Sequence, residues 1–100
     1  MELVKEIYRI TKLLPKMETY ILVSQMLRAA ISIVSNIAEG FKRNHRPEFK
    51  QFLGISNGSA GELEAQILVA KGESKNIDFS KAENLVIEVQ KMLHSMIIKM

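Results

Sequence analysis

The chain has 100 residues, 47% of them hydrophobic, which is enough for one domain with a core and too apolar for a disordered tail. It has no cysteine, which excludes disulfides and thiolate metal sites and suits a reducing compartment. The formal net charge is +3, and residues 1–50 carry nine Lys/Arg against five Asp/Glu, whereas residues 51–100 carry five against six. We find no apolar run long enough to span a bilayer and no signal peptide, and expect one soluble, cytoplasmic domain over residues 1–100 with no membrane partner.

The first predicted helix covers residues 2–14. Leu3, Ile7, Ile10 and Leu14 recur at helical spacing and predict a buried face. Pro15 should end this helix, because a proline ring clashes with a continuing helix.

The second predicted helix, residues 18–40, is apolar over more than half of its circumference. Such a helix must be covered from several sides, so it is the inner helix of a bundle or part of a subunit contact. Gly40 is placed to form a left-handed C-terminal cap, with Phe41 folding back on it. One narrow strip of this helix carries short polar groups between two charges: Arg28, Ser32, Ser35, Asn36 and Glu39. Short polar side chains suit a helix contact, although a merely solvated face is the alternative.

The third predicted helix, residues 47–71, begins with Pro47 at its first position. Its inner face is apolar, and its opposite face carries small residues, Gly54, Gly58, Gly61 and Ala65. Each glycine inside a helix costs roughly 1 kcal/mol relative to alanine, so three on one side indicate a groove where a second backbone lies close. The alternative is a helix broken at Asn57-Gly58, but the apolar register passes through that dipeptide unshifted.

The fourth predicted helix covers residues 79–99. Its start has capping-box spacing at Ser80, although Asp78 is an alternative cap. Its apolar seam steps at alternating intervals of four and three: Ala82, Val86, Val89, Leu93, Met96 and Met100. Four helices with short connections predict an all-α, antiparallel up-down-up-down four-helix bundle, with Leu63 and Val89 buried inside it.

Residues for catalysis or metal binding are not grouped in this sequence. A di-iron bundle needs Glu-x-x-His pairs, and neither His45 nor His94 has a Glu three residues before it. There is no Cys nucleophile, no phosphate-binding glycine loop and no plausible Ser-His-Asp set. Glu39, Glu62 and Glu64 fit helix-surface or interface salt bridges better than a catalytic carboxylate pair. We therefore expect no enzyme, no metal and no cofactor.

One basic cluster stands out between the second and third helices: Lys42, Arg43, His45, Arg46 and Lys50. Cations on a short loop between rigid helices can displace counterions from a nucleic acid backbone. The alternative is an ordinary solvated turn, since no aromatic residue stands out there to stack on bases.

The sequence resembles the bacterial four-helix-bundle proteins encoded in intervening sequences of 23S ribosomal RNA genes. The resemblance covers most of residues 3–71, and the fourth helix matches in pattern only. The residues that carry it are Pro15, Glu18, Tyr20, Leu22, Ser24-Gln25, Arg28-Ala29-Ala30, Ser32-Ile33, Ser35-Asn36-Ile37-Ala38-Glu39-Gly40, Glu48-Phe49, Phe52-Leu53, Gly58-Ser59, Glu62-Leu63-Glu64 and Gln66. Family members usually carry an aromatic-containing run before the first helix, and this chain starts after it. They usually have Pro where this sequence has Val34, which leaves the second helix straighter.

The resemblance implies a bundle that assembles into a ring, typically a homopentamer. It also implies kinship with the accessory variability proteins of diversity-generating retroelements, which are basic pentamers that bind nucleic acid and a reverse transcriptase. The subunit contact is expected at the polar strip of the second helix and the glycines of the third: Arg28, Ser32, Ser35, Asn36, Glu39, Gly54, Gly58 and Gly61.

Two functions remain open from the sequence. The first is a non-enzymatic homo-oligomer whose basic surface binds RNA or DNA. The second is an assembly or adaptor protein that binds another protein, for example a reverse transcriptase, without contacting nucleic acid.

Overall fold

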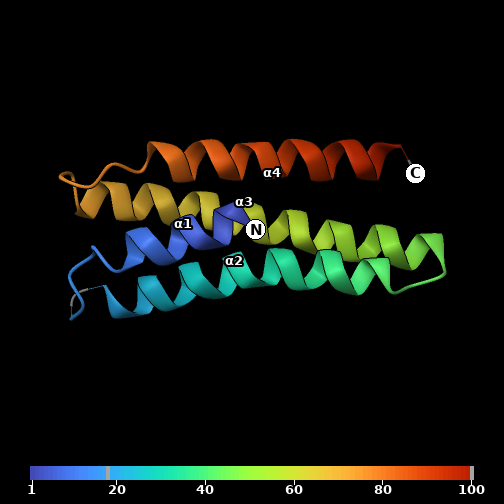
Figure 1. The fold of residues 1–100 in the computed structure, drawn as a ribbon, viewed down its shortest axis with the longest axis horizontal. Coiled ribbons are helices and arrows are strands. Elements are labelled where there is room, and N and C mark those ends of the chain that lie inside the picture. Colours follow the sequence, from blue (N-terminus) through green and yellow to red (C-terminus); the bar gives the residue numbers. More distant parts are fainter. Residues whose placement is uncertain (18, 100) are drawn as a thin grey trace.

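Four α-helices make up the fold in the computed structural model, which describes residues 1–17 and 19–99. They are α1 (Glu2–Thr11), α2 (Tyr20–Phe41), α3 (Arg46–Glu73) and α4 (Ser80–Ile98), and no strand occurs within the described residues. Successive helices run in opposite directions, with α2 against α3, α3 against α4, and α1 against both α2 and α4 (Figure 1). The predicted all-α, antiparallel bundle is confirmed. The predicted start of the second helix, Glu18, lies outside the described residues.

The first helix ends at Thr11, three residues earlier than predicted. Pro15 has no N–H to donate to the Thr11 carbonyl, and its ring clashes with that carbonyl, so the α-helical bond pattern cannot continue. The next residues make hydrogen bonds to the third residue before them instead of the fourth: Leu13 N–H donates to Ile10 O at 3.0 Å and Leu14 N–H to Thr11 O at 3.3 Å. The effect of Pro15 therefore reaches back through the whole preceding turn.

The second helix passes through Gly40 and ends at Phe41, so the predicted glycine cap is wrong. No glycine in the described residues has a positive φ angle. Gly40 is instead a point of close approach to α3: an added Cβ would lie 2.9 Å from Phe49 Cδ1 and 3.2 Å from Phe52 Cβ. Phe41 does not fold back on a cap either, since it stays largely exposed and its ring centroid lies 5.1 Å from that of Phe49.

The third helix is continuous from Arg46 to Glu73, and the alternative break at Asn57-Gly58 does not occur. Pro47 is within its first turn, as expected from the fixed φ of proline. The inner face packs directly against α2, where Ser56 Oγ donates to the carbonyl of Ile33 at 2.8 Å. That bond satisfies a hydroxyl that is fully buried in the interior.

The interior is apolar, and Leu63 is fully buried in it as predicted. Val89 is only half-buried, which corrects the second part of that prediction. The cause is the short first helix, whose N-terminus lies at mid-bundle (Figure 1). Glu2 lies 3.9 Å from Lys81, so the contact of α1 with α4 involves the beginning of α4, and α1 contacts α4 less extensively than α3 does. The predicted seam residue Met100 lies outside the described residues.

The fourth helix begins at Ser80, and its N-cap residue is Phe79, which makes no side-chain capping hydrogen bond, so neither the capping box at Ser80 nor a cap by Asp78 forms as predicted. Asp78 Oδ1 accepts hydrogen bonds from the Ser80 N–H at 2.9 Å and the Ser80 hydroxyl at 2.7 Å. These two bonds lower the pKa of Asp78, because they stabilise its charged form.

The second helix also meets the length and composition of a membrane span, with a mean hydropathy of 1.5. This corrects the expectation that no apolar run is long enough. The helix packs against both α1 and α3, but only 22% of this apolar window is buried inside the subunit.

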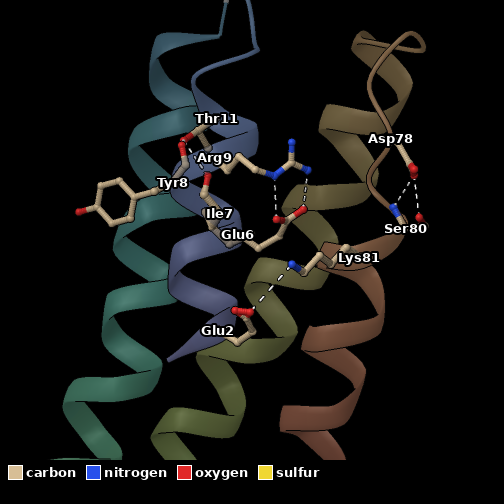
Figure 2. A network of polar contacts seen from close by, with 9 residues as sticks. All are labelled: Glu2, Glu6, Ile7, Tyr8, Arg9, Thr11, Asp78, Ser80 and Lys81. Atoms are coloured by element: carbon tan, nitrogen blue, oxygen red, sulfur yellow. Dashed lines mark hydrogen bonds and ion pairs between the residues drawn. The ribbon is translucent and has the colours of Figure 1, made fainter.

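An ion pair lies on the side of α1 that faces the start of α4 (Figure 2). Arg9 Nε and Nη2 donate to the two carboxylate oxygens of Glu6 at 2.9 and 2.8 Å, and Glu6 is only 3% exposed. The hydrogen bonds from Arg9 hold the pKa of Glu6 below its ordinary value of 4.5, although burial opposes this shift.

This pair predicts a component of acid sensitivity. Because the folded protein holds Glu6 deprotonated more strongly than the unfolded chain does, Glu6 stabilises the fold above about pH 4.5 and loses that effect as the pH falls through its lowered pKa. Urea midpoints measured between about pH 6 and pH 3 should fall more steeply for the wild type than for Glu6→Gln. Parallel curves for the two proteins would show that the pair does not couple stability to pH.

Candidate functional site

The basic cluster predicted from the sequence lies at one end of the bundle, in and after the α2–α3 connection (Figure 1). Five cationic or titratable side chains gather there, and all five residues are exposed: Lys42, Arg43, His45, Arg46 and Lys50. The end is held in place by α2 and α3, which make the most extensive contact in the bundle.

Two of these cations already have acidic neighbours in the same chain. Arg43 lies 3.1 Å from Glu39 and 3.9 Å from Glu48, and its guanidinium carbon is 5.0 Å from the centre of the Phe52 ring. Lys42 is 4.0 Å from Glu39. Glu39, which was expected at a subunit contact, therefore contacts the basic loop. The positive charge of Lys42 and Arg43 is therefore partly neutralised by Glu39 and Glu48, which the sequence did not indicate.

Arg46 and Lys50 differ from that pair. They are four residues apart in the first turns of α3, so they project from one side of the helix near its positive end. Within the described residues, neither has an ion-pair partner. These two side chains are the cations of the cluster that are open to an external anion.

The polar strip of α2 divides into two parts. Ser32 Oγ lies 2.8 Å from Ser59 Oγ of α3, and the Asn36 amide donates to the Ser32 carbonyl at 2.8 Å and to its hydroxyl at 3.0 Å. Ser32 thus joins α2 to α3 within the subunit, and Asn36 bonds to Ser32 within α2. Arg28 and Ser35 are exposed. Arg28 lines a polar cavity of about 260 Å³ between α2 and α3, together with Gln25, Ala29, Ser32, Ser59, Glu62 and Gln66.

The glycines of α3 line an open face of the subunit. Gly54 and Gly58 are exposed and Gly61 is half-buried, and an added Cβ at any of the three would meet no atom within 4 Å. Three large apolar side chains beside them are also exposed, Ile55, Leu68 and Val69. These three were not predicted from the sequence, although Leu68 follows Gly61 by seven residues and so shares its face. We call this surface the open α3 face: Gly54, Ile55, Gly58, Gly61, Leu68 and Val69.

The carboxylates considered as a possible pair are dispersed. Glu39 contacts the basic loop, Glu62 lines the polar cavity, and Glu64 accepts a hydrogen bond from Gln90 at 3.2 Å. In the described part of the chain, no three His, Asp or Glu residues are grouped as a metal site.

Comparison with known proteins identifies the relatives of this bundle. A crystal structure of a protein with unknown function from the S23 ribosomal protein family of Bacteroides thetaiotaomicron VPI-5482 is 25% identical, and the match covers 96% of this chain and 92% of that chain with a TM-score of 0.86. Among curated proteins, none is significantly similar. The profile of the 23S rRNA-intervening sequence proteins matches residues 1–95. Neither description names an enzymatic activity. Since that profile spans nearly the whole bundle, the chain belongs to the 23S rRNA-intervening sequence protein family.

Proposed function

We propose that the protein is a non-enzymatic, cyclic homo-oligomer that binds RNA or DNA through the basic end of each subunit. The observation that carries the nucleic acid part of this proposal is the pair Arg46 and Lys50, exposed at the start of α3. The family resemblance makes a pentamer the expected ring. A chain without cysteine suits a reducing compartment, so we propose that it acts in the cytoplasm.

The open α3 face supports the assembly part of the proposal. It combines exposed Ile55, Leu68 and Val69 with glycines over which a neighbouring backbone can lie close. Leu68 and Val69 are neighbours on this face, and large apolar patches are seldom left open to water on a soluble monomer. A head-to-tail contact that closes into a ring covers it on every subunit.

The basic end supports nucleic acid binding by the same ring. Side chains such as Arg46 and Lys50 replace the counterions that surround phosphates, so the binding they contribute weakens as salt rises. A ring presents this end once per subunit, which makes several weak phosphate contacts act together.

Binding measured over a range of salt tests this function. Removal of the two cations in Arg46→Gln/Lys50→Gln should weaken binding of a labelled oligonucleotide and reduce the slope of log affinity against log salt by about 0.7–0.9 for each phosphate that the variant no longer neutralises. Lys75→Gln is the matched control, because Lys75 is exposed in the α3–α4 connection at the opposite end of the bundle (Figure 1). It should leave the slope unchanged.

Two results would count against this function. If the wild type does not shift an oligonucleotide at low salt, or if the double variant keeps the wild-type slope, the basic end is a solvated turn. The competing function, an adaptor that binds another protein, predicts tight capture of that protein with no nucleic acid shift.

A further inference from the structure

A second basic surface runs along the junction of α1 and α2, at the end of the bundle away from the α2–α3 connection. It contains an open apolar cavity of about 370 Å³, lined by Tyr8, Thr11 and Leu14 on one side and Tyr20, Val23 and Leu27 on the other, with Lys12 and Lys16 beside them. Tyr8 is 43% exposed and Tyr20 is 74% exposed, so both rings are accessible from solvent. Each wall of the cavity therefore carries one accessible tyrosine.

The cavity continues along the same junction. A second one of about 250 Å³ is lined by Val4, Lys5 and Ile31, among others. Lys5 and Tyr8 are about one turn apart on α1, and Leu27 and Ile31 are one turn apart on α2, so the two cavities lie end to end. We call the combined surface the α1–α2 groove. Its walls are about as long as α1, which for ten residues is about 15 Å.

The charged side chains that line the α1–α2 groove in residues 1–17 and 19–99 are all lysines. Lys5, Lys12 and Lys16 line it, and no carboxylate from the described residues does. Within the described residues, none of these three lysines has an ion-pair partner, whereas Lys42 and Arg43 do. Figure 2 shows the reason on α1: Tyr8 projects from the side of the helix opposite to Glu2 and Glu6, which face Lys81 and Arg9.

We propose that the α1–α2 groove binds unpaired bases of a single-stranded nucleic acid, with Tyr8 and Tyr20 stacking on bases and the three lysines contacting phosphates. Aromatic side chains in a positively charged groove bind single strands in this way, because every base has a flat face. The inference rests on the proposed nucleic acid binding and adds the ligand class, unpaired strands, and the residues that contact bases. It adds two accessible tyrosine rings to the side chains proposed to contact nucleic acid.

A peptide is the other ligand that an apolar, basic groove can take. An acidic amphipathic helix would place aliphatic side chains in the groove and carboxylates near the lysines. Flat rings at both edges of the cavity match stacked bases better than the rounded side chains of such a helix. We therefore infer a nucleic acid strand and treat peptide binding as an outcome that would overturn the inference.

The tyrosines themselves report on this site. The chain has two Tyr and no Trp, so its intrinsic fluorescence comes from Tyr8 and Tyr20 alone. Titration with an oligothymidylate should quench this fluorescence, whereas an abasic strand of the same length and charge should bind more weakly and leave it unquenched. Tyr8→Leu and Tyr20→Leu should each weaken binding of a labelled oligothymidylate by roughly 5- to 150-fold. Tyr20→Phe should bind within roughly twofold of the wild type, because the ring face is kept.

The outcomes separate this inference from the proposed function. If the tyrosine variants bind like the wild type while Arg46→Gln/Lys50→Gln weakens binding, the nucleic acid binds at the basic end and not in the α1–α2 groove. If Arg46→Gln/Lys50→Gln keeps the wild-type quenching, affinity and slope of log affinity against log salt, the nucleic acid binds in the α1–α2 groove and not at the basic end. Quenching by an acidic amphipathic peptide but not by oligothymidylate would overturn the inference. So would a smaller assembly for Tyr20→Leu in light scattering, since the groove would then be a subunit contact. Thermal melting should show that Tyr20→Leu remains folded, because that side chain is exposed.

Discussion

Leu63→Ala is expected to reduce the free energy of unfolding by about 2–4 kcal/mol. Leu63 has no exposed surface and packs in the core cluster formed by all four helices. Truncation removes buried apolar surface and leaves a cavity, because helices held on several sides relax only in part. Urea unfolding followed by circular dichroism measures the change.

The control for this prediction is Ile98→Ala at the last residue of α4. Ile98 is 66% exposed, so its truncation should change the unfolding free energy by no more than about 0.5 kcal/mol. If Leu63→Ala were as mild as Ile98→Ala, the inner face of α3 would not be packed in the core.

Gly58→Leu is expected to dissociate the proposed ring while the subunit keeps its helices. An added Cβ at Gly58 meets no atom within 4 Å in its own chain, so the leucine side chain has room on an isolated subunit. Replacement of a mid-helix glycine by leucine also favours the helix by several tenths of a kcal/mol. On the open α3 face, however, the same side chain would hold a neighbouring backbone away. Sedimentation velocity should show a loss of the assembly, with the helical dichroism nearly unchanged.

Asn84→Leu is the matched control, because it places the same new side chain at an exposed position of α4. It should sediment like the wild type. An intact ring in Gly58→Leu would move the subunit contact away from the glycines of α3.

The overall architecture could be predicted because it depends on periodicity along each helix. The apolar register of α3 continues through Asn57-Gly58, and the structure has one unbroken helix there. The burial of Leu63 follows from the same local pattern. Such signals need no knowledge of how the helices meet.

The features that escaped prediction depend on contacts between distant residues. Gly40 has the sequence context of a cap, but the side chains of Phe49 and Phe52 require a small residue there. Val89 fits the seam of α4, yet it is only half-buried, because α1 is short and contacts α4 less extensively than α3 does.

The candidate surfaces show the same division. The basic end was visible as a run of cations, whereas the pairing of Arg43 with Glu39 and Glu48 required the positions of two helix ends. The α1–α2 groove was not predicted, because Tyr8 and Tyr20 belong to different helices and line one cavity only when those two helices pack together. The available signal was the spacing of Lys5, Tyr8 and Lys12, which places all three on one side of α1.

The molar mass of the wild-type protein in solution tests the proposed assembly most directly. Light scattering at micromolar concentration should give a multiple of the 11.4 kDa subunit, and about 57 kDa if the ring holds five copies of 11.4 kDa. Such a mass is the result expected if neighbouring subunits cover the open α3 face. A mass of 11.4 kDa across that concentration range would contradict the proposed ring, because the open α3 face would then remain in water.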